Sequence, residues 1–164
     1  MNTTPTSTGS CAHSAGMRRN TCQIMKKMSN FATSTTMEKK NPIEEARRYV
    51  ANAKEVIKKA EYDQELKAYT DRKYVKMAGN TLWNGCLIAL EAVFHLKTGK
   101  GRPSIDKYKE AAAKRDKKLL ASIEKGYDTM HLSMGYDGTK DPDVCKKGFA
   151  TATEIIDRCA MLLK

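Results

Sequence analysis

The stretch VKMAGNTLWNGCLIALEAVFHL, residues 75–96, decides the fold class of this chain. Its apolar residues recur in steps of three and four, which is the spacing of one face of an α-helix. That stripe consists of Val75, Ala78, Leu82, Cys86, Ala89, Val93 and Leu96. A second set of apolar residues widens it, so we expect this helix to be the most buried in the protein: Trp83, Leu87, Leu90 and Phe94.

The same spacing predicts one helix before this stretch and two after it. The helix before it starts with the cap Asn41 and the first-turn proline Pro42, and its stripe is Ile43, Ala46, Val50, Ala53, Ile57 and Ala60. The third helix, capped by Ser104, has the stripe Ile105, Tyr108, Ala112, Leu119, Ile123, Tyr127, Met130 and Met134. The fourth helix opens with Asp141 and Pro142, and its stripe is Cys145, Phe149, Ala152, Ile156, Cys159 and Leu163.

The connections between these helices carry polar and turn-forming residues. Residues 61–69 are polar, glycines and a proline within 98–103 end the second helix, and Gly-Tyr-Asp-Gly at 135–138 ends the third. No sustained apolar alternation indicates strands. We therefore expect residues 37–164 to form an all-α domain, an antiparallel up-and-down four-helix bundle.

Residues 1–36 differ from the rest in composition. They contain 13 Ser or Thr and no acidic residue. Such a segment cannot bury enough apolar surface to offset its ordering entropy, so we expect it to be a disordered leader. Two alternatives remain open: translation that starts naturally at Met37, and a transit peptide, which has a similar composition.

Composition also bounds the cellular setting. No window approaches the roughly 20 consecutive apolar residues that a membrane span requires. The chain has five cysteines, an odd number without a CxxC pair, and no secretion signal. We therefore expect reduced thiols and a cytoplasmic protein without a membrane segment.

The segment GYDTMHLSMGYDG, residues 126–138, concentrates groups that could do chemistry, including one of only three histidines, His131. It could be an active-site loop or the end of a helix. Tyr127, Met130 and Met134 continue the core spacing of the third helix, which favours the structural interpretation. His131 falls about one residue off the apolar seam.

Other signals of catalysis are sparse, and we expect no metal and no cofactor. Glu91 and His95, spaced i and i+4, are the nearest candidate for one half of a helical metal site, but a second such pair is missing, so we interpret them as a polar pair on the rim. The cysteines of the helical domain lie on apolar stripes, where a thiol ionises poorly. His131 is the only catalytic candidate, and we expect a protein that is not an enzyme.

Charge is distributed unevenly along the chain. The formal net charge is +11, and residues 97–125 carry ten Lys or Arg against four Asp or Glu. On a continuous helix, four lysines would point within roughly 20° of one direction: Lys107, Lys114, Lys118 and Lys125. Such a stripe could contact phosphates or could simply keep the surface solvated.

Residues 41–163 resemble an uncharacterised family of small helical bundles of unknown function known from gut anaerobes. The resemblance rests on EARRYVANAKEVI, KYVKMAGNTLWNGCLIALEAVF and GYDTMHLSMGYDG. More loosely, the chain is similar to HEPN domains, which are nucleotide-binding or RNA-processing bundles. Nuclease members carry Arg four to six residues before His, whereas this chain has Lys125 before His131. In a HEPN-like site His131 would be the acid or base, with Lys125 and Tyr127 lining the cleft. Tyr136 is a further candidate binding residue.

Two functions remain open at this point. The preferred hypothesis is a non-enzymatic cytoplasmic interaction module that acts as a homodimer or as the accessory partner of another protein, with a methionine-rich contact surface near Met130 and Met134. The alternative is an RNA- or nucleotide-binding HEPN-like domain, in its extreme form a degenerate ribonuclease, for which the lysine stripe and His131 are the binding candidates.

Overall fold

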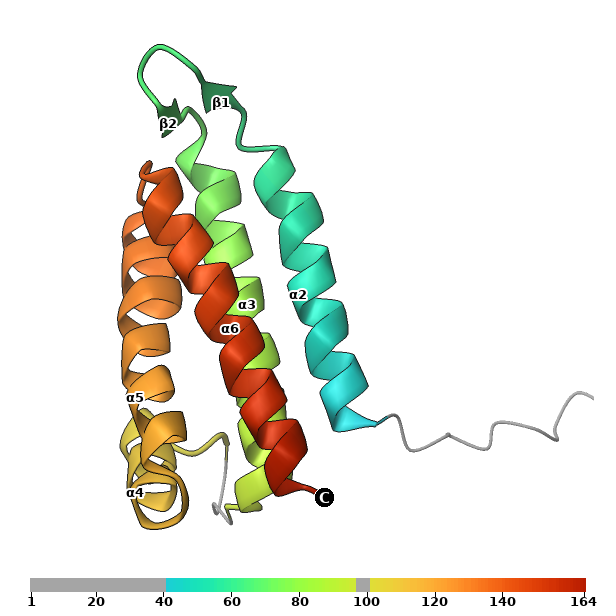
Figure 1. Cartoon of the computed structure of the whole chain (residues 1–164). Coiled ribbons are helices and arrows are strands. Elements are labelled where there is room, and N and C mark those ends of the chain that lie inside the picture. Colours follow the sequence, from blue (N-terminus) through green and yellow to red (C-terminus); the bar gives the residue numbers. More distant parts are fainter. Residues whose placement is uncertain (1–40, 97–100) are drawn as a thin grey trace, which may run out of the picture. The chain divides into compact units, whose positions relative to one another are not determined.

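A computed structural model describes residues 41–96 and 101–164, which form a mainly helical unit (Figure 1). Its α-helices are α2 (Pro42–Lys58), α3 (Arg72–Phe94), α4 (Ile105–Arg115), α5 (Lys117–Gly126) and α6 (Pro142–Leu162). A π-helix, η1 (Tyr127–Asp137), continues α5, and two short strands, β1 (Tyr62–Asp63) and β2 (Ala68–Tyr69), form a hairpin. The predicted leader at 1–36 lies outside the described residues.

The α3 helix contacts α2, η1 and α6. In Figure 1, α6 crosses in front of α3, with α2 on one side and the orange column of α5 and η1 on the other. Two of the predicted helix starts are confirmed by cap hydrogen bonds: the backbone amides of Ile43 and Asp143 donate to the side chains of Asn41 and Asp141 at 3.0 and 2.8 Å. The α3 helix has a similar cap, because the amide of Lys73 donates to the side chain of Asp71 at 2.8 Å.

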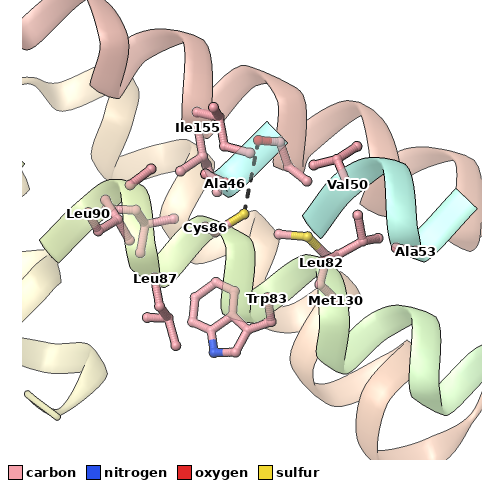
Figure 2. Close-up of a cluster of buried hydrophobic side chains, with 14 of the residues drawn as sticks. Ala46, Val50, Ala53, Leu82, Trp83, Cys86, Leu87, Leu90, Met130 and Ile155 are labelled. Carbon is pink, nitrogen blue, oxygen red and sulfur yellow. Dashed lines mark hydrogen bonds between the residues drawn. The ribbon is translucent and has the colours of Figure 1, made fainter. Parts of the chain in front are cut away.

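Figure 2 shows the core of this unit, centred on α3. The side chains of Leu82, Cys86 and Leu90 on α3 and of Ala46 and Val50 on α2 are all buried. The thiol of Cys86 points to α6, where it donates to the carbonyl of Ala152 at 4.0 Å. The backbones of α2 and α3 approach closely at Gly85, where an added Cβ would lie 2.8 Å from the Cβ of Tyr49. With 11 buried residues, more than any other described helix, α3 is the most buried one, as predicted.

The predicted third helix is not continuous, and the prediction of four helices is wrong in this respect. Asp116 adopts an extended conformation with φ −155°, which ends α4 and caps α5. Its Oδ1 atom accepts hydrogen bonds from the amides of Lys118 and Leu119 at 2.9 and 3.0 Å. Aspartate competes with helical hydrogen bonding in this way because its short carboxylate can bind the following amides. Ser104, the predicted cap, stands before α4 but makes no side-chain cap bond.

Two arginines hold this break against the neighbouring helices. The guanidinium of Arg158 on α6 donates to both carboxylate oxygens of Asp116, at 2.7 to 3.2 Å. Arg115 donates to the carbonyl of Val93 at 3.2 Å and to that of Leu162 at 3.1 Å. These carbonyls lie at the C-terminal ends of α3 and α6, where a cation also interacts favourably with the helix dipole.

The last part of the predicted third helix is the π-helix η1 rather than an α-helix. Eleven residues adopt this form, although π-helices usually occur as single-turn bulges. A π-helix is wider than an α-helix, and here glycines on the surrounding helices provide the room. Added Cβ atoms at Gly79 of α3, Gly126 of α5 and Gly148 of α6 would lie 2.5 to 2.7 Å from atoms of Met130 or Met134. Gly138, with φ 66°, ends η1.

The polar connection at 61–69 contains the hairpin, so the expectation of no strands is wrong at this point. Tyr62 pairs with Tyr69, and the carboxylate of Asp63 accepts hydrogen bonds from the amides of Glu65 and Leu66 at 2.8 and 2.9 Å. The amide of Tyr69 donates to the carbonyl of Lys140 at 2.9 Å, which ties the hairpin to the loop before α6. Within the described ranges, no helix is both long enough and apolar enough to cross a membrane.

Candidate functional site: the α3–η1 face

One side of α3 remains uncovered by its neighbours. We call this side the outer face of α3, and it consists of Lys73, Met77, Asn80, Asn84, Ile88 and Glu91. At 3.6 residues per turn these six side chains point within a sector of roughly 80°. All six are exposed or half-buried. The exposed fraction of Met77 is 45%, which is high for a methionine on the central helix.

The π-helix extends this surface sideways. An added Cβ at Gly79 would lie 2.7 Å from the backbone nitrogen of Gly135, so the two helices are in close contact. The side-chain amide of Asn80 donates to the carbonyl of Gly135 at 3.3 Å. On either side of Gly135, Leu132 and Tyr136 are 38% and 75% exposed. We call the outer face of α3 together with Leu132 and Tyr136 the α3–η1 face.

An aromatic cluster lies beneath this face where α3 meets η1. The ring of His131 lies 5.1 Å from that of Tyr127 and 6.0 Å from that of Trp83, and the rings of Trp83 and Tyr127 are 5.8 Å apart. The ammonium group of Lys109 lies 5.6 Å from the centre of the Tyr127 ring. The Nδ1 atom of His131 is buried and has no hydrogen-bond partner among the described residues. The structure thus brings two predicted site residues together, His131 and Tyr127, but as packed rings.

A polar cluster occupies the other end of the outer face. The guanidinium of Arg102 donates to Glu91 Oε1 at 2.6 Å and to Asn84 Oδ1 at 3.1 Å. The buried Tyr108 donates its hydroxyl to the same Glu91 oxygen at 3.3 Å. Burial and the neighbouring carboxylate raise the pKa of Tyr108 to about 12, so it remains a hydrogen-bond donor at neutral pH.

Glu91 therefore binds Arg102 and Tyr108, and His95 plays a separate role. His95 ends α3 with φ 45° and is exposed. Within residues 41–96 and 101–164, no three His, Cys, Asp or Glu side chains are grouped so that they could hold a metal ion. Next to this pair lies an open depression lined by Glu91, His95, Leu96, Gly101, Arg102 and Pro103.

The four predicted lysines do not share one helix. Lys107 and Lys114 belong to α4, and Lys118 and Lys125 belong to α5, because α4 ends at Asp116. The prediction of a single lysine stripe on one continuous helix is therefore wrong. The two lysines on α4 are seven residues apart, as are the two on α5, so each pair still points in one direction from its own helix. All four are exposed, and none takes part in an ion pair within the described part of the chain.

The described residues carry 22 Lys or Arg and 18 Asp or Glu. Residues 101–126 hold eight of these basic and four of these acidic residues, so the whole excess of four positive charges lies there. One of the four acidic groups, Asp116, is neutralised by Arg158 from α6. The α4–α5 segment is therefore the basic part of an otherwise balanced surface.

The described thiols and the predicted methionine surface lie in the interior. Burial raises the pKa of the Cys86 thiol, and it raises the pKa of Cys145 to about 11 and that of Cys159 to about 12. The predicted contact surface near Met130 and Met134 is wrong, because both side chains are completely buried in the glycine-lined space around η1.

Sequence reasoning missed Met77, Asn80 and Asn84. Asparagines spaced i and i+4 on the most apolar helix of the chain were the available signal. Tyr136, by contrast, was a binding candidate from sequence, and the structure places it at the surface.

Comparisons with known proteins agree with this fold. A solved structure described as a protein of unknown function from Dyadobacter fermentans is similar to the chain, with 43% sequence identity and a TM-score of 0.67. The similarity covers 72% of this chain and 93% of that one. None of the curated proteins matches. A family model matches residues 41–161, and the chain belongs to that family, DUF5618, a domain of unknown function.

Proposed function

We propose that this domain is a non-enzymatic interaction module and that a protein partner docks on the α3–η1 face. The observation that carries the proposal is the exposure of Tyr136, Met77 and Leu132 around the close contact of α3 with η1. Aromatic residues, Met and Arg are enriched in protein interfaces, and buried anchors of this kind supply most of the binding energy. The glycine-mediated contact beneath them provides a rigid base, which lowers the entropy cost of binding.

The size of the face also suits a protein. The 23 residues of α3 span about 34 Å at 1.5 Å per residue. The 11 residues of η1 border less than half of that length, so at about 10 Å of width per helix the face covers roughly 500 Å². A standard interface buries about 800 Å² on each partner, so this face corresponds to a small protein interface.

Three features argue against chemistry as the role of the described residues. The Nδ1 atom of His131 is enclosed and its ring is packed against Trp83 and Tyr127. Lys125 stands where nucleases of the HEPN type carry arginine, and a point charge does not replace a planar fork. The described thiols are buried and have raised pKa values, so little thiolate is available as a nucleophile.

Site-specific photocrosslinking in cells that express the chain tests the proposal. A benzophenone amino acid replaces Met77 or Tyr136 in two variants, and it replaces Asn52 of α2 or Thr153 of α6 in two exposed controls. We expect a discrete crosslinked product from the first two variants only. Equal crosslinking at all four positions, or none at Met77 and Tyr136, would contradict the proposed docking face.

A second candidate function, supported by the charge of the α4–α5 segment, is binding of RNA or another nucleic acid. The uncompensated lysines could neutralise phosphates, which would give an affinity that falls steeply with salt. The loose similarity to HEPN domains points in the same direction. Base readout is not part of this candidate, because the Tyr127 ring already contacts the ammonium group of Lys109 and the rings of Trp83 and His131.

Retention of a single-stranded RNA at low salt tests this candidate. Replacing Lys107, Lys114 and Lys118 by Glu should abolish retention of the RNA. A control variant with Glu in place of Lys54, Lys59 and Lys147 has the same net charge and should still retain the RNA. Absence of retention by the unmodified chain would exclude the candidate. If RNA is cleaved, cleavage that persists in His131→Ala would exclude His131 as its acid or base.

A further inference from the structure

We infer that the partner on the α3–η1 face is a second copy of this chain, with the two α3 helices antiparallel and the two-fold axis at the level of Leu82. The inference rests on the proposed docking role of this face. It specifies the partner and the register, and three independent features of α3 support it.

The first feature is the distribution of charge along α3. Its basic residues are Arg72, Lys73 and Lys76, at its N-terminal end, and its only acidic residue is Glu91. Basic groups at a helix N-terminus interact unfavourably with the helix dipole. Among the described residues, no ion pair compensates these three. Because Lys73 and Glu91 each lie nine positions from Leu82, an antiparallel copy places Lys73 next to Glu91 twice.

The second feature is a complementary pair of amides. Asn80 uses its Nδ2 atom to donate to Gly135, and no described residue donates to its Oδ1 atom. Asn84 uses its Oδ1 atom to accept from Arg102, and its Nδ2 atom has no acceptor among the described residues. Asn80 and Asn84 lie two positions on either side of Leu82, so the same register places them opposite each other. The Nδ2 atom of Asn84 can then donate to the Oδ1 atom of Asn80 in the copy, twice.

The third feature is the apolar content of the face. In this register Met77 lies beside Ile88 of the copy, and Leu132 and Tyr136 flank the helix pair. A parallel arrangement would instead place Lys73 against itself. An unrelated acidic partner would compensate the lysines, but nothing would require it to match the amides of Asn80 and Asn84, so the charges and the amides taken together favour a second copy.

A cysteine pair tests the register directly. The full chain carrying Cys11→Ser and Cys22→Ser serves as background, since the described cysteines are buried. Asn80→Cys and Asn84→Cys are prepared separately, mixed and oxidised mildly. We expect the mixed disulfide between positions 80 and 84 to exceed the 80–80 and the 84–84 products by much more than the about twofold excess that random pairing gives. A mixed product at or below that random excess, or no disulfide, would refute the register.

Sedimentation equilibrium of the unmodified chain and of Lys73→Glu tests the second copy. Reversing this charge replaces two attractive contacts by two repulsive ones, so we expect the dimer to dissociate roughly tenfold more readily. Lys54→Glu on α2 is the matched control and should leave the dimer unchanged. A chain that remains monomeric at every concentration refutes the inference. If that monomer still crosslinks to another protein through Met77 and Tyr136, the docking face stands, whereas crosslinking at neither position overturns both.

Discussion

Replacing Gly79 by Ala tests the account of how η1 fits into the fold. In the interior of an ordinary helix this change stabilises a protein, because alanine favours the helix by about 0.8–1.0 kcal/mol over glycine. At Gly79, however, the added Cβ would lie 2.5 Å from the Cβ of Met134 and 2.7 Å from both the nitrogen of Gly135 and the carbonyl oxygen of Met130. Two of these three atoms are backbone, so no side-chain rotation can relieve the contact.

The net effect follows from these opposing contributions. Overpacking a core typically costs about 1–3 kcal/mol, and the backbone contacts at Gly79 place it at the upper end of that range. After subtraction of the gain in helix propensity, about 2 kcal/mol of destabilisation remains. For a domain of this size that corresponds to a decrease of roughly 5–10 °C in Tm.

Urea unfolding followed by tryptophan fluorescence is a suitable assay. The chain contains one tryptophan, Trp83, and its ring lies 5.8 Å from Tyr127 of η1, so its emission reports on the contact between α3 and η1. As a control, Ala150→Gly on the exposed side of α6 should lose only about 1 kcal/mol of helix propensity. A Gly79→Ala variant as stable as the unmodified chain, or more stable, would refute the packing argument.

Three further predictions concern Asp116, His131 and the buried thiols. Burial alone would raise the pKa of Asp116, but hydrogen bonds from Leu119, Arg158 and Lys118 outweigh it and lower that pKa. The Asp116 carboxylate therefore stabilises the fold above its unfolded pKa of about 3.9, and this stability is lost as the pH falls towards the lower folded pKa. In urea unfolding, Asp116→Asn should lose less stability on acidification than the unmodified chain, and an unchanged dependence of stability on pH would contradict this. His131→Phe should keep the free energy of unfolding within about 1 kcal/mol, because no hydrogen bond is lost and the ring packing remains; a larger loss in urea unfolding would reveal a missed partner. Iodoacetamide at mildly alkaline pH should modify Cys86 and the other buried thiols only after denaturation, as measured by mass spectrometry, and rapid labelling of the native chain would show that they are accessible.

Helices α2, α3 and α6 could be predicted from sequence because local and long-range signals agree there. Each begins with an Asn or Asp cap, and each has a sustained apolar stripe that the structure largely buries, although Leu163 at the end of the last stripe is 43% exposed. The break at Asp116 was missed because the apolar residues on its two sides keep helical spacing across it. The hairpin was missed because two-residue strands leave no alternation to detect.

The π-helix was missed for a different reason. Met130 and Met134 are four residues apart, and this spacing places side chains on one side of either kind of helix. What selects the wider form is the space around it, provided by Gly79 on α3 and Gly148 on α6. These glycines are distant in sequence from η1, so no local pattern could indicate them.

The candidate site was predictable only where a residue type signals chemistry by itself. Tyr127 and His131 were found, and the structure places them together, but their packing against Trp83 is a tertiary property. Asn80 and Asn84 gave only a weak signal, their spacing of i and i+4 on an apolar helix, because asparagine does not indicate chemistry by itself. Their significance depends on which of their amide atoms are already bonded, and only the structure provides that information.

The described interior and the outer face of α3 differ in how completely their polar groups are bonded, and this difference underlies the proposed docking role. The interior has few unsatisfied groups: within the described residues, only His131 Nδ1 and Thr151 Oγ1 are buried side-chain polar atoms without a hydrogen bond. The outer face of α3 has more polar groups without a partner among the described residues: a lysine without an ion pair at one end and amide atoms without a hydrogen bond at its centre. Water can satisfy such groups in the free protein, so they cost little there. They contribute to binding only when a partner of matching pattern replaces that water, and an antiparallel α3 presents that pattern.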